Sequence, residues 1–292
     1  MNIQLFHPVS LEETDLFYPY WDKTPERAMT YSMVTLWGWK HYNDLEWAFD
    51  KDLCWIRPTK FEPDLYWAPV GDWQAADWER VLEKGMRFIC VPESLAKLWA
   101  DRLGDRIHIE EDRGQFEYIY RTEDLANLSG NRYHKKKNHL SAYKKAFGEP
   151  DYRPISDSII EDCLALQDTW CQWNDCAGSE TLAGENYSLN LLLSHFNKFR
   201  NLCGGALYIN DEIVAFSIGE RLDDATMGVH YEKGMSSIRG VYQAMNWAFV
   251  NNECRGIPYI NRAEDMDDDG LRQAKLSYHP ACFLKKYTVT IS

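Results

Sequence analysis

The stretch INDEIVAFSIGERLDDATMGVHYEKGMSSIRGVYQAMN, residues 209–246, decides which fold the sequence predicts. Two segments rich in apolar and β-branched residues, 213–222 and 226–233, flank the turn residues Asp223 and Asp224, which predicts a pair of antiparallel strands. Gly240 then precedes the segment 241–254, whose pattern predicts a helix. The stretch therefore predicts two paired strands, a loop and a helix.

The flanking sequence extends this order in both directions. Upstream, we expect a helix at 132–147, a strand and a helix within YRPISDSIIEDCLALQDTWCQW (152–173), a helix near 186–200 and a strand at 205–209. Downstream, we expect a strand at 259–263, a helix at 269–278 and a closing strand at 283–291. This mixture of strands and helices is typical of the α+β or mixed α/β class.

The first half of the chain begins in a similar way. LFHPVSLEETDLFYPYW (5–21) predicts a strand followed by a helix with Ser10 as its N-cap, much like the start of 152–173. Later elements are expected as helices at 30–40, 73–84 and 93–104, strands within 45–59 and at 65–70 and 87–91, and a hairpin at 106–120. We interpret this as a weak internal repeat, which predicts two domains, 1–128 and 129–292, each a mostly antiparallel mixed sheet flanked by helices.

The composition favours a soluble, cytoplasmic globular protein. Apolar residues make up 45% of the 292 residues, enough for a substantial core. No apolar run approaches the roughly 20 residues that span a bilayer, and the first residues lack a signal-peptide pattern. The eight cysteines are scattered without a C-x-x-C pair, so we expect reduced, mostly buried thiols and no metal site.

Charge is distributed unevenly along the chain. The formal net charge is −13, and an acidic surface repels nucleic acid, so we expect no DNA partner. The segment 131–145 nevertheless contains no acidic residue and holds the cations Arg132, Lys135, Lys136, Lys137, Lys144 and Lys145. This basic segment is the strongest local exception to the acidic background.

Three segments in order carry a family resemblance: LSGNRYHKKKNHLSAYKKAF (128–147), the stretch 209–246, and INRAEDMDDDGLRQAKLSYHP (260–280). Together they resemble the C-terminal domain of the bacterial phosphatidylglycerol lysyltransferases, which are GNAT-like aminoacyltransferases, and the element order resembles that of the GNAT acyltransferase fold. The resemblance implies two GNAT-like domains in tandem, of which we expect the first to be a degenerate copy. It also implies an aminoacyl-tRNA donor.

The basic helix 132–147 is one candidate for binding the donor. One face of it carries Tyr133, Leu140, Tyr143 and Phe147, and Lys137 and Lys144 flank that face. The cations that we expect to hold donor phosphates are Arg132, Lys136, Lys137 and Lys144. The alternative is a solvated linker helix.

Arg239 and Gly240, just before the helix 241–254, are a second candidate for donor binding. In GNAT enzymes the equivalent loop directs backbone N–H groups at a pyrophosphate, helped by the helix N-terminus. The single glycine matches the usual R/Q-x-x-G-x-G/A pattern poorly, which weakens acyl-CoA as the donor relative to aminoacyl-tRNA. The alternative is an ordinary helix cap.

His230, Glu232 and Tyr278 are the candidate catalytic residues. His230 and Glu232 alternate with Val229 and Tyr231, so we expect them to share one face of a strand, where either serves as the base for an acceptor. Tyr278 would return a proton to the leaving group. The alternatives are a hydrogen-bonded structural histidine and a tyrosine of the core.

The segment EDMDDDGLRQAK (264–275) begins like a calcium-binding EF-hand loop, but Leu276 stands where the closing glutamate is required. It also follows an expected strand, and the carboxyl ends of strands commonly present ligand groups. We therefore expect a substrate-binding role for Arg262, Glu264, Asp265 and Lys275. The alternative is a network of ion pairs that braces this corner.

The sequence thus predicts a GNAT-like transferase without a tightly bound cofactor. It would move an acyl or aminoacyl group from acyl-CoA or aminoacyl-tRNA to a small amine or hydroxyl acceptor, which includes a lipid headgroup. No covalent intermediate is needed, because positioning and oxyanion stabilisation suffice for such a transfer. The alternative is a phosphate-, RNA- or coenzyme-binding protein that retains the fold without turnover.

Overall fold

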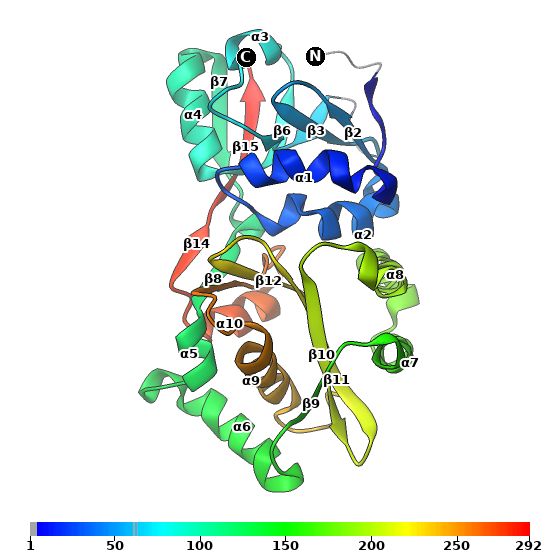
Figure 1. Ribbon diagram of the computed structural model, residues 1–292. Coiled ribbons are helices and arrows are strands. Elements are labelled where there is room, and N and C mark those ends of the chain that lie inside the picture. The colour runs from blue at the N-terminus through cyan, green and yellow to red at the C-terminus, as the bar shows by residue number, and fades with distance from the viewer. Residues whose placement is uncertain (1–4, 61, 63) are drawn as a thin grey trace. The chain divides into compact units, whose positions relative to one another are not determined.

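The computed structural model describes residues 5–60, 62 and 64–292, and contacts divide them into two compact units (Figure 1). Unit 1 contains the described residues up to Glu117 together with 264–269 and 283–292, and unit 2 contains 118–263 and 270–282. The sequence predicts one domain boundary, between residues 128 and 129. The chain instead passes between the units after residues 117, 263, 269 and 282.

The sheet of unit 2 is mixed and mostly antiparallel. Its strands follow the order β8-β13-β12-β11-β10-β9, with β14 beyond β8. β12 pairs with β11 in the antiparallel sense and with β13 in the parallel sense. The strand bounds are β8 (Glu117–Arg121), β9 (Asp151–Pro154), β10 (Leu202–Ile209), β11 (Glu212–Arg221), β12 (Thr226–Gly234), β13 (Tyr259–Asn261) and β14 (Cys282–Leu284).

Helices cover both faces of this sheet (Figure 1). They are α5 (Thr122–Asn127), α6 (His134–Phe147), α7 (Asp157–Trp173), α8 (Glu180–Ser194), α9 (Val241–Glu253) and α10 (Asp269–Leu276). α7 and α8 lie on one face, where the hydroxyl of Tyr231 on β12 is 2.6 Å from that of Ser188 on α8. α9 lies on the other face, where Phe249 leaves no room for a side chain at Gly219 on β11.

The predicted order of elements between residues 132 and 278 is confirmed. The expected strands 213–222 and 226–233 correspond to β11 and β12, and the expected helix 241–254 corresponds to α9. The turn between the strands forms because the carboxylate of Asp223 accepts a hydrogen bond from the backbone N–H of Ala225 at 2.8 Å. The opening stretch therefore adopts the structure that its pattern indicates.

A β-bulge in β12 changes which of its residues share a face. Residues 218 and 219 of β11 pair with residues 231 and 229 of β12, so His230 is an extra residue in β12. Glu232 pairs with Ser217 and faces α9, whereas His230 contacts Glu220 on the face of α7 and α8. The expectation that His230 and Glu232 share a face is wrong, because the bulge interrupts the two-residue alternation.

The basic helix α6 packs its apolar side onto unit 2. Tyr133, Leu140 and Tyr143 are buried as expected, whereas Phe147 is 46% exposed at the C-terminal end. Lys136 lies between Tyr133 and Leu140 on the same side, because three- and four-residue steps repeat on one helix face. The packed side of α6 therefore carries a lysine.

Unit 1 contains, among the described residues, two four-stranded sheets with the orders β1-β2-β3-β5 and β4-β6-β15-β7. The strands are β1 (His7–Pro8), β2 (Leu45–Phe49), β3 (Leu53–Pro58), β4 (Leu65–Trp67), β5 (Val70–Gly71), β6 (Arg87–Pro92), β7 (Ile107–Glu111) and β15 (Lys286–Ile291). The helices are α1 (Thr14–Lys23), α2 (Met33–Asn43), α3 (Trp78–Val81) and α4 (Glu93–Leu103). Large aromatic side chains fill the core, with at most 1% exposure at Phe17, Trp47, Trp55, Phe88 and Trp99.

Two predicted strand pairings are wrong. The expected hairpin 106–120 does not form, because β7 pairs with β15 and β8 pairs with β13. The closing strand, expected in the second domain, forms β15 between β6 and β7 of unit 1. The expected helix 73–84 is also reduced to the single turn of α3.

Cys171 and Cys176 form a disulfide bond, so the expectation that all cysteines are reduced is wrong for these two. The end of α7 and the turn after it bring their Cα atoms within 5.0 Å, inside the range that a disulfide requires. The free cysteines are Cys54, Cys90, Cys163, Cys203, Cys254 and Cys282.

The described residues contain no helix with both the length and the apolar character needed to cross a bilayer.

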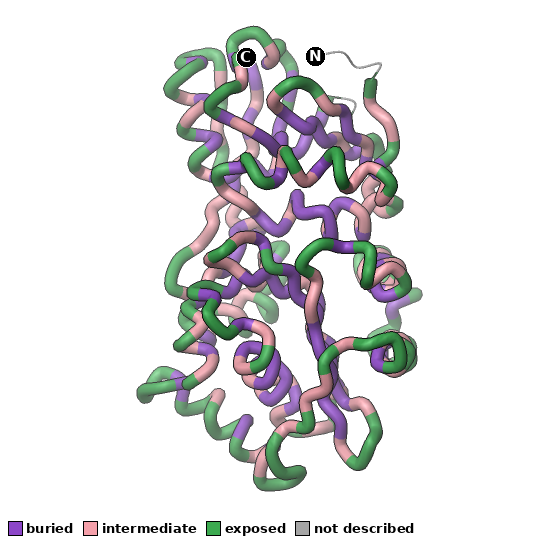
Figure 2. The backbone as a smooth tube through the Cα atoms, in the orientation of Figure 1, coloured by how far each residue is buried: buried purple, intermediate pink, exposed green. Residues whose placement is uncertain are grey.

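Buried positions concentrate on the sheet strands and on α9, whereas α6 is exposed along much of its length (Figure 2).

Gly240 is expected to be essential for packing α9 against α6. It has φ +84°, and a Cβ built there would lie 2.2 Å from the carbonyl oxygen of His139. Gly256 has a similar φ of +80°, but a Cβ there would meet nothing within 4 Å. Gly240→Ala should therefore lower the free energy of unfolding by about 2 kcal/mol or more, and Gly256→Ala by only about 1 kcal/mol from backbone strain. Chemical denaturation measures both losses, and equal losses would contradict the close packing.

Candidate functional site

Buried polar side chains gather on the α9 face of the unit 2 sheet. Glu232 on β12 lies opposite Ser217 on β11, and Asn246 extends from α9 toward this face. Ser217 and Asn246 are 0% and 2% exposed. Buried polar groups normally have hydrogen-bond partners. A buried polar atom that lacks one therefore marks a position where a ligand atom or a water molecule would fit.

Glu232 is paired through one of its oxygens only. Nη2 of Arg262, which follows β13, is 3.1 Å from Oε1 of Glu232, and both side chains are largely buried. Oε2 of Glu232 has no hydrogen-bond partner. Burial raises the pKa of Glu232, and the nearby Arg262 charge acts in the opposite direction. The carboxylate is thus held in place with one oxygen available.

Lys136 and Tyr278 lie next to this pair. Nζ of Lys136 is 3.9 Å from the centroid of the Tyr278 ring, and the guanidinium carbon of Arg262 is 5.3 Å from the same centroid. Burial, followed by repulsion from Arg262, lowers the pKa of Lys136 from 10.5 to about 8, although Glu232 opposes this shift. Burial raises the pKa of Tyr278 to about 12, so its hydroxyl keeps its proton near neutral pH. We call the six residues Lys136, Ser217, Glu232, Asn246, Arg262 and Tyr278 the Glu232 cluster.

Three atoms of the Glu232 cluster have no hydrogen-bond partner: Oε2 of Glu232, Oγ of Ser217 and Nδ2 of Asn246. The Asn246 amide is near enough to lower the pKa of Glu232, but its Nδ2 lies outside hydrogen-bonding geometry. Leaving a buried polar group unpaired costs about 1–3 kcal/mol. The three atoms offer an acceptor, a hydroxyl and an N–H donor, which is complementary to a hydroxyl group or a water molecule. An ammonium group fits less well, because it has no lone pair to accept a hydrogen bond from Nδ2 of Asn246.

His230, the other expected base, lies away from the Glu232 cluster. Its Nε2 is 2.9 Å from Oε2 of Glu220, and the two side chains are 5% and 3% exposed. This contact matches the structural alternative for a histidine on a strand. Of the three expected catalytic residues, Glu232 and Tyr278 are brought together and His230 is not.

The expected donor-binding cations are not gathered at one point. Arg132 pairs with Asp124 at 2.8 Å, and Lys144 pairs with Glu149 at 2.6 Å and covers the ring of Trp247. Lys137 and Arg239 are exposed, whereas Lys136 belongs to the Glu232 cluster. Gly240, at the start of α9, lies against α6.

The four expected substrate-binding residues are divided between the units. Nζ of Lys275 donates a hydrogen bond of 2.7 Å to the carbonyl oxygen of Arg262, so in unit 2 it supports the backbone that carries the cluster arginine. In unit 1, the fully buried Asp265 pairs with Arg113 at 3.1 Å. Glu264, also in unit 1, lies 4.0 Å from Lys286. These contacts resemble the bracing alternative, although the partners differ from those expected.

Ser217 and Asn246 were missed by sequence reasoning. A serine within a strand and an asparagine within a helix carry no recognisable signal, since their importance depends on which groups they face. Lys136 had a detectable signal, because steps of three and four residues from Tyr133 to Leu140 pass through it.

The lowered pKa of Lys136 predicts a pH-dependent contribution to stability. Between pH values of about 8 and 10.5, the unfolded chain keeps a proton on Lys136 that the folded chain has released. The contribution of Lys136 to the free energy of unfolding therefore rises with pH across this window. Denaturation at about pH 7 and about pH 10 should show the natural chain gaining stability relative to Lys136→Met. A difference between the two proteins that does not change with pH would contradict the burial of Lys136.

Known proteins with a similar sequence include one family and one curated relative. The sequence profile of the family described as "Phosphatidylglycerol lysyltransferase, C-terminal" matches residues 22–290. An uncharacterised protein of Mycoplasmoides gallisepticum is 25% identical over 175 residues, which are 60% of this chain. The chain spans about half, 56%, of the length of that curated relative.

Two solved structures are similar over nearly the whole chain. A conserved protein of unknown function from Bacteroides thetaiotaomicron is 31% identical with a TM-score of 0.87, and the match covers 98% of this chain and 99% of that one. The C-terminal domain of a putative lysylphosphatidylglycerol synthetase from Agrobacterium fabrum is 14% identical with a TM-score of 0.64, covering 96% of this chain and 92% of that one. At the lower identity the likeness shows the fold alone. Since the family profile covers most of the sequence, the chain belongs to the phosphatidylglycerol lysyltransferase C-terminal family.

Proposed function

We propose that this protein transfers an activated aminoacyl or acyl group to the hydroxyl of an acceptor at the Glu232 cluster. The observation that carries the proposal is the buried Glu232 carboxylate, held through one oxygen by Arg262 and open at the other beside Ser217 and Asn246. Membership of the family makes a lysyl group the first donor group to test and a phosphatidylglycerol headgroup the first acceptor.

Glu232 acts as the general base in this proposal. Its Oε2 accepts the hydrogen bond of the acceptor hydroxyl and takes the proton as the hydroxyl oxygen attacks the acyl carbonyl carbon. Nδ2 of Asn246 and Oγ of Ser217 hold the acceptor oxygen, which satisfies the three atoms that otherwise lack partners. The pKa of Glu232, raised by burial, makes the carboxylate a better proton acceptor than an exposed one.

The cations of the cluster stabilise the developing negative charge. Arg262 and Lys136 both lie against the Tyr278 ring, and in this proposal they bring positive charge to the place where the acyl oxygen becomes an oxyanion. Tyr278 keeps its proton near neutral pH and donates it to the leaving oxygen of the donor. No covalent acyl-enzyme is required, because base, oxyanion stabilisation and acid are all present.

The packing of Gly240 supports aminoacyl-tRNA rather than acyl-CoA as the donor. A pyrophosphate seat at the start of α9 would need open space, but the carbonyl of His139 on α6 lies against Gly240. Helix α6 instead exposes the cations Lys135, Lys137 and Lys145 and contains no acidic residue. Exposed cations without acidic neighbours in the same helix suit the phosphate backbone of RNA.

The central test is lysyl transfer from charged tRNA to vesicles that contain phosphatidylglycerol. Glu232→Gln keeps the shape of the side chain but removes the base, so kcat should fall by about 10²- to 10⁴-fold with little change in KM. Glu253→Gln is the matched control, because Glu253 is a part-buried carboxylate of α9 that bonds to Tyr152 outside the cluster. A natural chain that binds tRNA but transfers nothing from lysyl-tRNA or acyl-CoA would favour a binding protein and overturn the proposal.

Donor binding through α6 has a separate test. Lys137→Ala should weaken tRNA binding and reduce the slope of log K against log salt by about 0.7–1, as expected when one phosphate contact is lost. Lys198→Ala removes another exposed lysine of unit 2, outside α6, and should leave the slope unchanged. Equal slopes for the natural chain and both variants would exclude Lys137 from the RNA contact.

A further inference from the structure

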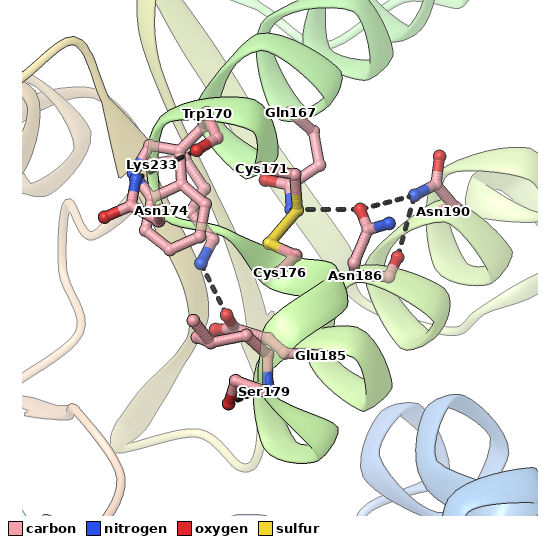
Figure 3. The surroundings of a disulfide bond; sticks show 11 residues. Gln167, Trp170, Cys171, Asn174, Cys176, Ser179, Glu185, Asn186, Asn190 and Lys233 are labelled. Carbon is pink, nitrogen blue, oxygen red and sulfur yellow. Dashed lines mark hydrogen bonds and ion pairs between the residues drawn. A yellow bond between two sulfur atoms is a disulfide. The ribbon is translucent and has the colours of Figure 1, made fainter.

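The disulfide bond lies at the corner between α7 and α8. Cys171 is in the last turn of α7, and Cys176 begins the short 3-10 turn Cys176–Gly178 that leads into α8 (Figure 3). Ser179 then caps α8 by accepting a hydrogen bond from the N–H of Leu182 at 3.3 Å. We call residues 171–179 the α7–α8 corner. The bond fixes the path of this corner and therefore the start of α8.

The two bonded cysteines differ in burial. Cys171 is half-buried, and Cys176 is only 6% exposed. A thiolate from solution therefore reaches Sγ of Cys171 first, and Cys176 becomes the leaving sulfur. The free Cys163, in the same helix, is completely buried and is not available for exchange with this bond.

The helices on either side of the corner share a buried lysine. Nζ of Lys233 on β12 is 2.6 Å from Oε2 of Glu185 on α8 and 3.7 Å from the ring centroid of Trp170 on α7 (Figure 3). The Lys233 side chain is only 6% exposed. A buried ammonium group needs such partners, and these two come from the helices that the corner connects. The position of the corner is thus coupled to the environment of Lys233.

The same tryptophan connects the corner to the segment that carries Glu232. Nε1 of Trp170 donates to the hydroxyl of Tyr242 at 3.4 Å, and that hydroxyl donates to the carbonyl oxygen of Gly234 at 3.0 Å. Lys233 and Gly234 directly follow Glu232 at the end of β12. A movement of Trp170, the neighbour of Cys171, therefore acts on the end of the strand that bears the proposed base.

We propose that Cys171 and Cys176 form a reversible redox switch that sets the order of the α7–α8 corner and, through Trp170 and Lys233, the end of β12. The reductant is a dithiol. One thiolate attacks Sγ of Cys171, the Cys171–Cys176 bond breaks, and Sγ of Cys176 leaves and takes a proton. The second thiol displaces Sγ of Cys171, so the protein gains two electrons and two protons and the reductant becomes a disulfide.

Hydrogen exchange with the intact protein tests the switch directly. On reduction, amides of residues 171–185 should exchange roughly tenfold faster or more, because the loop constraint is lost, and reoxidation should restore protection. The double variant Cys171→Ser/Cys176→Ser should exchange at the fast rate with or without the dithiol. Cys282→Ser, which removes the exposed free thiol, should behave like the natural chain.

Three results would overturn the switch. One is equal exchange of residues 171–185 in the oxidised and reduced protein. Another is an equal acceleration throughout unit 2, which would mean general destabilisation rather than a local change. The third is alkylation of Cys171 and Cys176 as free thiols after air oxidation.

The effect on the Glu232 cluster rests on the proposed function and has its own measurement. Lysyl transfer by the natural chain and by Cys282→Ser should change severalfold between the two redox states, while transfer by the double variant stays constant. Redox-dependent exchange with equal transfer rates would remove the link between corner and cluster. Absence of transfer in every state would count against the proposed function, whereas the exchange result would still decide on the switch.

Discussion

The pairing of β11 with β12 is the constraint on which the rest of unit 2 depends. Its bulge places one extra residue, His230, in β12. Residues after the bulge therefore face the opposite side of the sheet from the side that uninterrupted alternation with the residues before it would give. Glu232 is turned toward α9 and Arg262, while His230 is turned toward Glu220. A strand without the bulge would separate Glu232 from the groups that hold it.

Two buried glutamates, Glu117 in unit 1 and Glu232 in unit 2, differ in how many of their oxygens have partners. This difference distinguishes a structural ion pair from the proposed base. In unit 1 the buried Glu117 uses both oxygens: Oε2 accepts from the N–H of Met29 at 3.1 Å, and Oε1 lies 2.7 Å from Nζ of Lys286. Such a pair, fully satisfied, is typical of a structural ion pair. Glu232 is also buried and paired, yet its second oxygen and the polar atoms of Ser217 and Asn246 have no partner. Unpaired buried atoms are destabilising, and the gathering of three of them on one face is what a bound hydroxyl group or water molecule would satisfy.

Helix α6 contributes both to donor binding and to the Glu232 cluster in the proposed reaction. Its outer side presents cations to solvent, where RNA phosphates could bind, and its inner side presents Lys136 to Tyr278. The close contact of His139 with Gly240 fixes α6 against the start of α9. On the opposite face of the sheet, α7 and α8 hold Lys233 through Trp170 and Glu185, so β12 is contacted by charged or polar groups from both faces. The strand that carries Glu232 is therefore positioned by helices on both sides.

The sequence by itself determined the order of the elements between residues 132 and 278, the family, and the candidates Glu232, Arg262, Tyr278 and Lys136. These follow from local patterns, since the period of apolar residues and the turn residues act between neighbours in the chain. Only the tertiary structure decided that β15, at residues 286–291, pairs with β6, at residues 87–92, in unit 1. It also decided that His230 bulges, that Cys171 and Cys176 are bonded, and that Ser217 and Asn246 face Glu232. These depend on contacts between residues far apart in the sequence, or on one extra residue in a strand, and neither leaves a periodic signal.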